Sequence, residues 1–115
     1  MPTQRYTPQG LADALASSRE SDYIRITATW LSRVSDWTTQ PAQTGDDAVD
    51  ALVAAASGYA ALRHGEPEPR WTAGKRLDHF WHPGGGSMFA WSFAHTPASF
   101  KIRGIVVDGD SLVSV

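Results

Sequence analysis

The chain has 115 residues, a net charge of −2 and no cysteine. A chain of this length forms one domain that can bury roughly two-thirds of its unfolded surface, so residues 1–115 are expected to be a single domain. The lack of cysteine excludes disulfides and thiolate metal ligands and favours the cytoplasm. Residues 1–10 lack the apolar segment of a signal peptide, and no apolar run approaches the roughly 20 residues of a membrane span. No membrane partner is therefore expected.

Two helices are predicted at the start of the chain. Thr7 can cap a helix whose first position is Pro8, and this helix is expected to end near Ser18. A second helix is expected from residue 21 or 22 to residue 37, because its apolar residues fall at helical spacing. Pro41 follows, and the residue before a proline disfavours the helical conformation, so the helix must stop before it.

A third helix has the strongest signals. Residues 44–47, Thr-Gly-Asp-Asp, match a capping-box pattern, and their acids favour the positive end of a helix dipole. Arg63 and His64 lie in the expected last turn, and Gly65 is suited to a left-handed cap. The predicted buried stripe comprises Val49, Leu52, Val53, Ala56 and Ala60.

A stiff Glu-Pro-Glu-Pro spacer at residues 66–69 separates a helical half, residues 1–65, from an aromatic and basic half, residues 70–115. Short helices are predicted in this second half over residues 72–77, 87–95 and 97–103. A strand is predicted at residues 105–107 and a turn at 108–109.

The last residues, 112–115, are expected either to return as a second strand or to form a short helix capped by Asp110. The predicted fold class is mainly α within α+β. It is a compact helical domain with a small C-terminal β element.

Residues 70–103 differ from the rest of the chain in composition. They contain three of the five tryptophans, all four phenylalanines and three of the four histidines, with a charge of +4, whereas residues 1–69 carry −4. Aromatic rings and arginine are the side chains that dominate binding energy at protein interfaces. The basic segment can pair with the acidic half of its own chain, which is the favoured interpretation, or attract an acidic partner.

Several chemical functions are weighed and set aside. His79 and His82, even with His95 or Asp78, do not make the fuller ligand set of a zinc site. The glycines at residues 84–86 and the serine that follows them lack the Lys-Ser or Lys-Thr of a phosphate-binding loop. No Gly-x-Ser-x-Gly elbow supports a hydrolase. We therefore predict no catalytic residue, no metal and no cofactor.

Direct DNA reading by the first half is also disfavoured. A recognition helix is basic on its exposed face. The second predicted helix carries only Arg25 and Arg33 as cations, with acidic residues flanking them.

The second half resembles a bacterial family whose members share Pro-x-Trp, Arg-x-Leu, an aromatic pair and then Ser/Thr-Pro-x-x-Phe before two basic residues and an apolar strand. Here these motifs are residues 69–71, 76–78, 80–81 and 96–107, and the resemblance covers about residues 67–113. The chain departs from the pattern at Phe80-Trp81-His82, where the family has Pro-Trp-Phe, and at His95, where an acid is common.

Members of that family are typically encoded beside nucleotidyltransferase-like toxins, so the resemblance implies an antitoxin that neutralises its cognate toxin by direct contact. A neutraliser needs a rigid face with aromatic and arginine anchors rather than a catalytic group. The predicted partner-binding residues are Arg70, Trp71, Arg76, Phe80, Trp81, His95, Phe100 and Arg103.

Three alternatives remain open. The arginines can engage the metal-holding carboxylates of a toxin, or the acidic first half can mimic phosphate through Asp46, Asp47 and Asp50. The segment of residues 70–103 can instead bind nucleic acid as a regulator. A homodimer is a further alternative.

Overall fold

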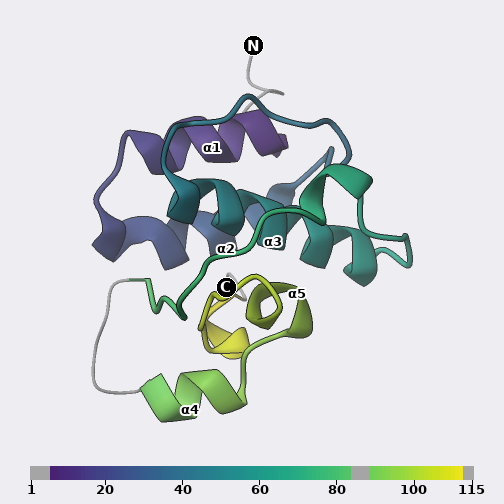
Figure 1. Cartoon of the computed structure of the whole chain (residues 1–115). Coiled ribbons are helices and arrows are strands. Elements are labelled where there is room, and N and C mark those ends of the chain that lie inside the picture. The colour runs from purple at the N-terminus through teal and green to yellow at the C-terminus, as the bar shows by residue number, and fades with distance from the viewer. Residues whose placement is uncertain (1–5, 84–88, 113–115) are drawn as a thin grey trace.

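The computed structural model describes residues 6–83 and 89–112, which form a compact, mainly helical chain (Figure 1). Its radius of gyration is 12.7 Å, close to the roughly 13 Å of a folded domain of this size. The α-helices are α1 Pro8–Ala16, α2 Tyr23–Arg33, α3 Asp47–Arg63, α4 Phe89–Ala94 and α5 Ala98–Lys101. Short 3-10 helices lie at η2 Glu20–Asp22, η3 Arg70–Thr72 and η4 Gly109–Leu112.

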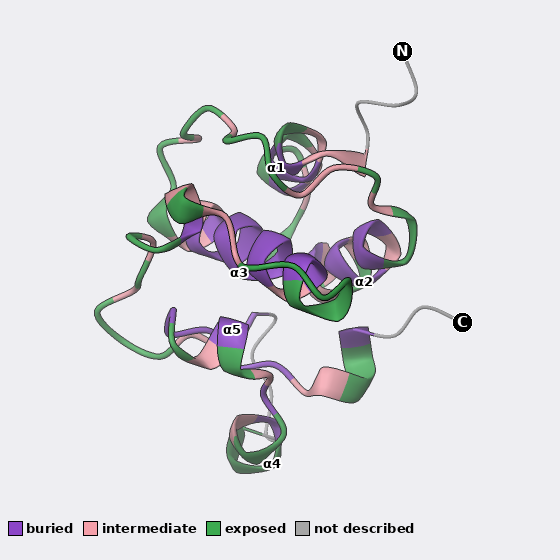
Figure 2. Cartoon of the chain, turned by 90° about the vertical axis from the view of Figure 1, so that its right-hand side faces the viewer, coloured by how far each residue is buried: buried purple, intermediate pink, exposed green. Residues whose placement is uncertain are grey.

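Helix α3 is the centre of the fold. It packs against α1, α2, η3 and α5, and Figure 2 shows it buried along most of its length. Its residues 51–58 are all buried, because alanine and glycine let neighbouring elements approach on every side. The predicted stripe on α3 is buried as expected, but burial extends around the whole helix.

The predicted cap of α1 is confirmed, whereas α3 starts two residues later than its capping-box pattern predicted, with Asp46 and not Thr44 as the N-cap. The Thr7 hydroxyl accepts a hydrogen bond from the Gly10 backbone N–H at 3.1 Å, and Pro8 is the first helical residue. The Asp46 carboxylate accepts from the N–H groups of Ala48 and Val49, which satisfies donors that have no partner within the helix.

The predicted end of α3 is confirmed as well. Gly65 follows the last turn with a φ of +73°, in the left-handed region that favours glycine.

Helix α2 is shorter than predicted. It ends at Arg33, and Val34 has an extended ψ of 131°. The next backbone N–H, that of Ser35, donates to the Tyr6 carbonyl oxygen at 3.1 Å instead of continuing the helix. Trp37 is thereby carried to the end of α3, where its ring stacks on His64 with centroids 4.4 Å apart.

The C-terminal β element is not confirmed. Within residues 6–83 and 89–112 no strand is present, and a single parallel bridge joins Trp81 to Ile105. Trp81 donates to the Gly104 carbonyl and accepts from the Val106 N–H, both at 2.8 Å. The next N–H, that of Val107, donates to the Thr96 hydroxyl at 3.1 Å, so no ladder forms beyond the bridge.

The other predicted elements of the second half are formed in part. The helix predicted over residues 72–77 does not form: η3 ends at Thr72, and residues 73–77 are turn and coil. The predicted helix start at Thr96-Pro97 does lead into α5, with Pro97 as the N-cap residue. Thr96 does not cap the helix, and its hydroxyl donates instead to the Ser92 carbonyl oxygen. Gly104, with a φ of +85°, follows α5 as expected. Residues 84–87 and 113–115, including the predicted cap Ser87, lie outside the described residues.

The two halves of the chain are joined by a buried ion pair. Nη2 of Arg103 donates to Oε1 of Glu68 at 2.8 Å, and the Arg103 side chain is only 4% exposed. The guanidinium also donates to the carbonyl oxygens of Ser99 and Thr72 and to the Thr72 hydroxyl. Gly58 of α3 leaves room for Glu68, because a Cβ at that position would overlap the Glu68 carboxylate.

Candidate interaction surface

Helix α4 lies at the opposite end of the molecule from α1 (Figure 1). Its Ser92 is buried, whereas Ala90 and Ala94 are exposed. At 100° per residue, these alanines lie on the side of α4 opposite Ser92. The aromatic residues of α4 therefore fall on its two flanks.

The first flank is a cluster of phenylalanines. The ring of Phe93 meets that of Phe80 edge-on with centroids 5.1 Å apart, and it lies parallel to that of Phe89 at 6.1 Å. Nζ of Lys101 lies 4.7 Å from the centre of the Phe93 ring, which is a cation–π distance. Phe80 is 53% exposed and Phe89 is 42% exposed, so this cluster faces outward.

The second flank is a tryptophan–histidine pair. The rings of Trp91 and His95 stack with centroids 4.0 Å apart, and a His95 ring nitrogen lies 2.8 Å from the Trp91 carbonyl oxygen. The indole N–H of Trp91 donates to the Asp108 carboxylate at 3.2 Å, which fixes the orientation of the ring. Trp91 is nevertheless 53% exposed.

We define the α4 aromatic surface as Phe80, Phe89, Trp91, Phe93 and His95. Its rings are held by one another and by Lys101 and Asp108. Four of these residues are exposed, and Phe93 is half-buried among them. Large exposed apolar groups gathered in one place are unusual on a monomer and are typical of interaction sites. The arrangement supplies rigid anchors for binding.

Of the eight predicted partner-binding residues, Phe80 and His95 belong to the α4 aromatic surface. Arg76, Phe80 and Trp81 line one open hollow of about 400 Å³, whose wall also includes Asp47 at the start of α3. Arg76 is exposed. The structure thus places four of the predicted residues, Arg76, Phe80, Trp81 and His95, on or beside the α4 aromatic surface.

Two other predicted residues, Trp71 and Arg70, lie elsewhere. Trp71 is half-buried, packs against the core and donates its indole N–H to the Thr38 carbonyl oxygen at 2.8 Å. Arg70 is exposed in η3, beside Trp71 in the chain. Trp81, although it reaches the hollow, also packs edge-on against Tyr23 of α2 with centroids 6.1 Å apart.

The prediction that Phe100 and Arg103 belong to an exposed surface is wrong. Phe100 is fully buried, with its ring edge-on to Tyr59 of α3 at 5.5 Å. Arg103 is 3% exposed, and its guanidinium is occupied by Glu68, Thr72 and Ser99. The interpretation that the basic segment pairs with the chain's own acids therefore holds for Arg103.

Phe89, Trp91 and Phe93 are the surface residues absent from the predicted set. The signal for them was the spacing of Phe89 with Phe93 and of Trp91 with His95, each four residues apart on a helix. A helix as short as α4 cannot bury both flanks against a single neighbour. Position along the chain alone, however, does not reveal which aromatics become covered.

The acidic residues proposed as phosphate mimics are largely occupied locally. Asp46 caps α3, and the Asp50 carboxylate accepts from the backbone N–H and hydroxyl of Thr44 at 3.1 and 2.9 Å. Asp47 is exposed. Of the three acids in the phosphate-mimicry hypothesis, Asp46 and Asp50 are therefore engaged within the chain, and the hypothesis now rests on Asp47.

The three histidines of the second half are not gathered into a metal site. The His82 ring lies edge-on to Phe89, while His95 stacks on Trp91. Across residues 6–83 and 89–112, no three His, Asp or Glu side chains are grouped closely enough to hold a metal ion. In the same part of the chain, no helix has the length and apolar character needed to cross a bilayer.

Comparisons of the chain with protein-family models, with curated proteins and with solved structures find no match. The α4 aromatic surface is thus described by its own geometry alone.

Proposed function

We propose that this protein is a protein-binding module that engages its partner through the α4 aromatic surface. The exposure of Trp91 on one flank of α4 and of Phe80, which packs against Phe93 on the other flank, is the observation that carries this proposal; each is 53% exposed. Rings that are already oriented lose little conformational entropy when a partner covers them, and buried aromatic anchors contribute most of the binding energy in many interfaces.

The family resemblance sharpens the proposal to an antitoxin. In this proposal the partner is a nucleotidyltransferase-type toxin encoded beside the chain, and neutralisation occurs by direct contact in the cytoplasm. Arg76 lies in the hollow next to Phe80 and Trp81, so it can pair with a carboxylate of the toxin while the rings anchor the interface. Arg103 takes no part, because it is buried.

Nucleic-acid binding by residues 70–103 is the weaker candidate. Of the five cations in this segment, Arg103 is paired inside the protein and Lys101 is half-buried against the Phe93 ring. A surface with few free cations releases few counterions from DNA, and counterion release supplies most non-specific affinity.

Co-expression with the adjacent toxin tests the proposal. We expect the wild-type chain to copurify with the toxin and to restore growth, and the Phe80→Ala/Trp91→Ala double variant to lose both effects. Each truncated anchor is expected to weaken binding by roughly ten-fold or more. Leu62→Ala is the matched control, because Leu62 is 51% exposed on the last turn of α3, outside the α4 aromatic surface.

The dependence on salt separates the two candidates. An aromatic-anchored protein complex is expected to keep its Kd within a few-fold between about 50 and about 200 mM salt, whereas a phosphate-driven complex weakens steeply over that range. If the toxin does not bind, or if the double variant binds and rescues as well as Leu62→Ala, the proposal is wrong.

A further inference from the structure

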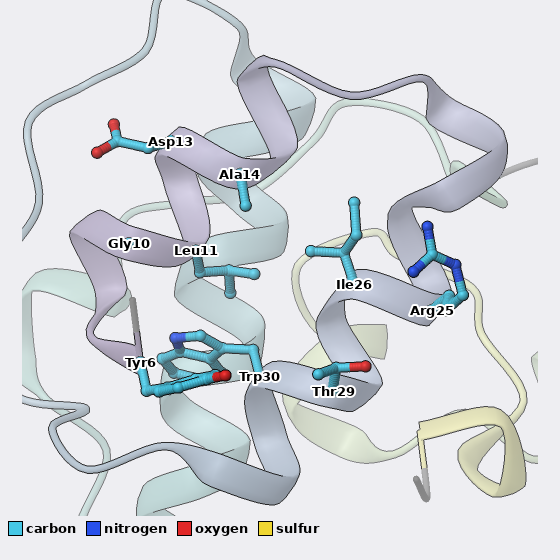
Figure 3. A pocket seen from close by; sticks show the side chains of 9 residues that line it. All are labelled: Tyr6, Gly10, Leu11, Asp13, Ala14, Arg25, Ile26, Thr29 and Trp30. Atoms are coloured by element: carbon cyan, nitrogen blue, oxygen red, sulfur yellow. The ribbon is translucent and has the colours of Figure 1, made fainter. Parts of the chain in front are cut away.

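A second site lies between α1 and α2, among residues other than those of the α4 aromatic surface. The two helices enclose a hollow of about 380 Å³ (Figure 3). Its walls are Leu11 and Ala14 from α1, Ile26 and Trp30 from α2, and Tyr6 just before α1. This volume falls within the range of about 300–1,000 Å³ that is typical of small-molecule sites, and such sites are mostly apolar with a few polar groups.

The apolar walls of this hollow are rigid. Leu11 and Trp30 are almost fully buried where α1 and α2 pack on the core. The indole N–H of Trp30 donates to the Thr7 carbonyl oxygen at 2.9 Å, which holds the ring in place. Ala14 and Ile26 are only half-buried, so a ligand would cover apolar surface that the chain itself leaves open.

The polar groups around the hollow favour an anion. Arg25 lines it, and Arg33 donates from Nη1 to the Tyr6 hydroxyl at 3.1 Å at the Tyr6 end. Asp13 is the single carboxylate in the lining; it accepts from the Gln9 amide at 2.9 Å, and Figure 3 shows it pointing away from α2. Although residues 1–69 carry −4 overall, one arginine and one acid line this hollow, and the acid is already hydrogen-bonded to Gln9. Arg25 is therefore the charged group of the lining that can meet a ligand.

Arg25 is available to a ligand. It pairs with Asp22, at 3.5 Å between Nη2 and Oδ1, and the Arg25 side chain is 71% exposed. An exposed pair of this kind contributes little stability, so exchanging it for a ligand carboxylate has a small cost. The planar guanidinium can then bind a carboxylate or a sulfonate through two parallel hydrogen bonds.

We propose that the α1–α2 hollow binds a small organic anion with a flat or branched apolar body. The body covers Ile26 and Ala14, whose apolar surface the chain leaves open, and its anionic group meets Arg25 at the rim. This binding is separate from the proposed protein partner and does not depend on it.

Naphthalene-2-carboxylate is the probe that tests this inference, with its neutral amide, naphthalene-2-carboxamide, as the matched compound. Binding to the full chain is followed by NMR through the methyl groups of Leu11, Ala14 and Ile26. We expect saturable shifts of these methyls with a Kd of roughly 1 mM or tighter for the carboxylate, and weaker binding of the amide.

Three variants define the site. Arg25→Gln is expected to raise the Kd of the carboxylate roughly ten-fold, while Ala14→Leu fills the hollow and removes binding. Arg19→Gln is the control, because Arg19 is 86% exposed and pairs with the same Asp22 at 3.9 Å but does not line the hollow. Unchanged circular dichroism and melting of each variant show that it is folded.

The inference is overturned by any of three results. These are the absence of saturable shifts at the three methyls, equal affinity for the carboxylate and the amide, or an Arg25→Gln variant that binds as well as Arg19→Gln. Trp91→Ala is expected to leave the Kd unchanged, because Trp91 belongs to the α4 aromatic surface. Loss of probe binding in Trp91→Ala would place the probe on α4 and would also overturn the inference.

Discussion

Large apolar side chains are usually buried, but here the mostly small side chains of helix α3 are buried and the large rings of helix α4 are mostly exposed. Helix α3 consists largely of alanine and other small residues and is buried on nearly every side, while α4 carries three large aromatic rings and is mostly exposed. Small residues allow close packing at the centre of this fold, because neighbours can approach from several directions. Large rings on a peripheral helix of six residues have too few neighbours to cover them. Burial is thus decided by the position of a helix among its neighbours, and the exposed rings are the basis of the proposed interaction surface.

The first way to sharpen this comparison is to truncate one tryptophan of the core around α3, Trp30 of α2, and one tryptophan of α4. Trp30→Ala removes a side chain that is 2% exposed, so it is expected to lower the free energy of unfolding by about 3–5 kcal/mol. Trp91→Ala removes a half-exposed ring and is expected to cost under about 1 kcal/mol. Urea unfolding followed by circular dichroism measures both. Equal losses would show that α4 is as well covered as the core.

The second prediction tests the α3 side of the comparison, at the ion pair that lies against Gly58 of this helix. Arg103→Ala removes the buried guanidinium and leaves Glu68 and the surrounding carbonyl groups without their donor. Removing one partner of a buried pair typically costs about 3–5 kcal/mol, and the lower end is expected here because Glu68 is 27% exposed. Arg70→Ala, at an exposed arginine, is the control in the same unfolding experiment. A loss in Arg103→Ala no larger than in Arg70→Ala would contradict the role given to the pair.

The third prediction concerns the small residue of α3 that lies beneath Glu68. In an open helix, Gly58→Ala would stabilise by up to about 1 kcal/mol, but here the added Cβ overlaps the Glu68 carboxylate. We expect Gly58→Ala to destabilise by about 1–3 kcal/mol. In a Glu68→Ala background the same substitution is expected to be neutral or stabilising, and a double-mutant cycle measures the difference. If the effects of the two substitutions on the free energy of unfolding are additive, the contact between Glu68 and position 58 does not cause the loss of stability in Gly58→Ala.

The smallest effect is expected from a pH-dependent contact in the exposed connection between α2 and α3. Burial raises the pKa of Asp36, but hydrogen bonds from Thr38 and Thr39 outweigh it and bring the pKa below its ordinary value of 3.8. The carboxylate of Asp36 thus contributes stability that is present above pH 3.8 and is lost as the pH falls through its folded-state pKa. The difference in melting temperature between wild type and Asp36→Asn is therefore expected to shrink below pH 3.8. A difference that does not change with pH would exclude this contribution.

The helix boundaries with short-range signals could be predicted from the sequence. Thr7 and Gly65 act on backbone groups within a few residues of themselves, so their roles follow from the local chain. The capping-box pattern placed the start of α3 within two residues of its actual cap, Asp46. The end of α2 could not be found in this way. It is set by Tyr6, whose carbonyl oxygen accepts from Ser35 across 29 positions of the chain.

In the aromatic half, too, some features of the candidate site could be predicted from the sequence and others depended on distant contacts. Its concentration of rings was evident in the sequence, and the rings of Phe80 and His95 do reach the surface. Phe100 and Phe93 are equally apolar, yet one lies against α3 and the other lies beside Phe80 and Phe89. Composition does not distinguish them, because the difference lies in which element each ring meets.

By itself, the sequence determined a mainly helical chain, the cap of α1, the glycine that ends α3 and the segment in which the aromatic residues concentrate. These features depend on backbone hydrogen bonds and spacing within a few residues. Only the tertiary structure decided that residues 105–107 form no ladder, that Arg103 turns inward to Glu68, and that the rings of α4 remain uncovered. Each of these outcomes depends on which distant segment comes to lie alongside, because a buried hydrogen bond or an ion pair forms only where a partner is present.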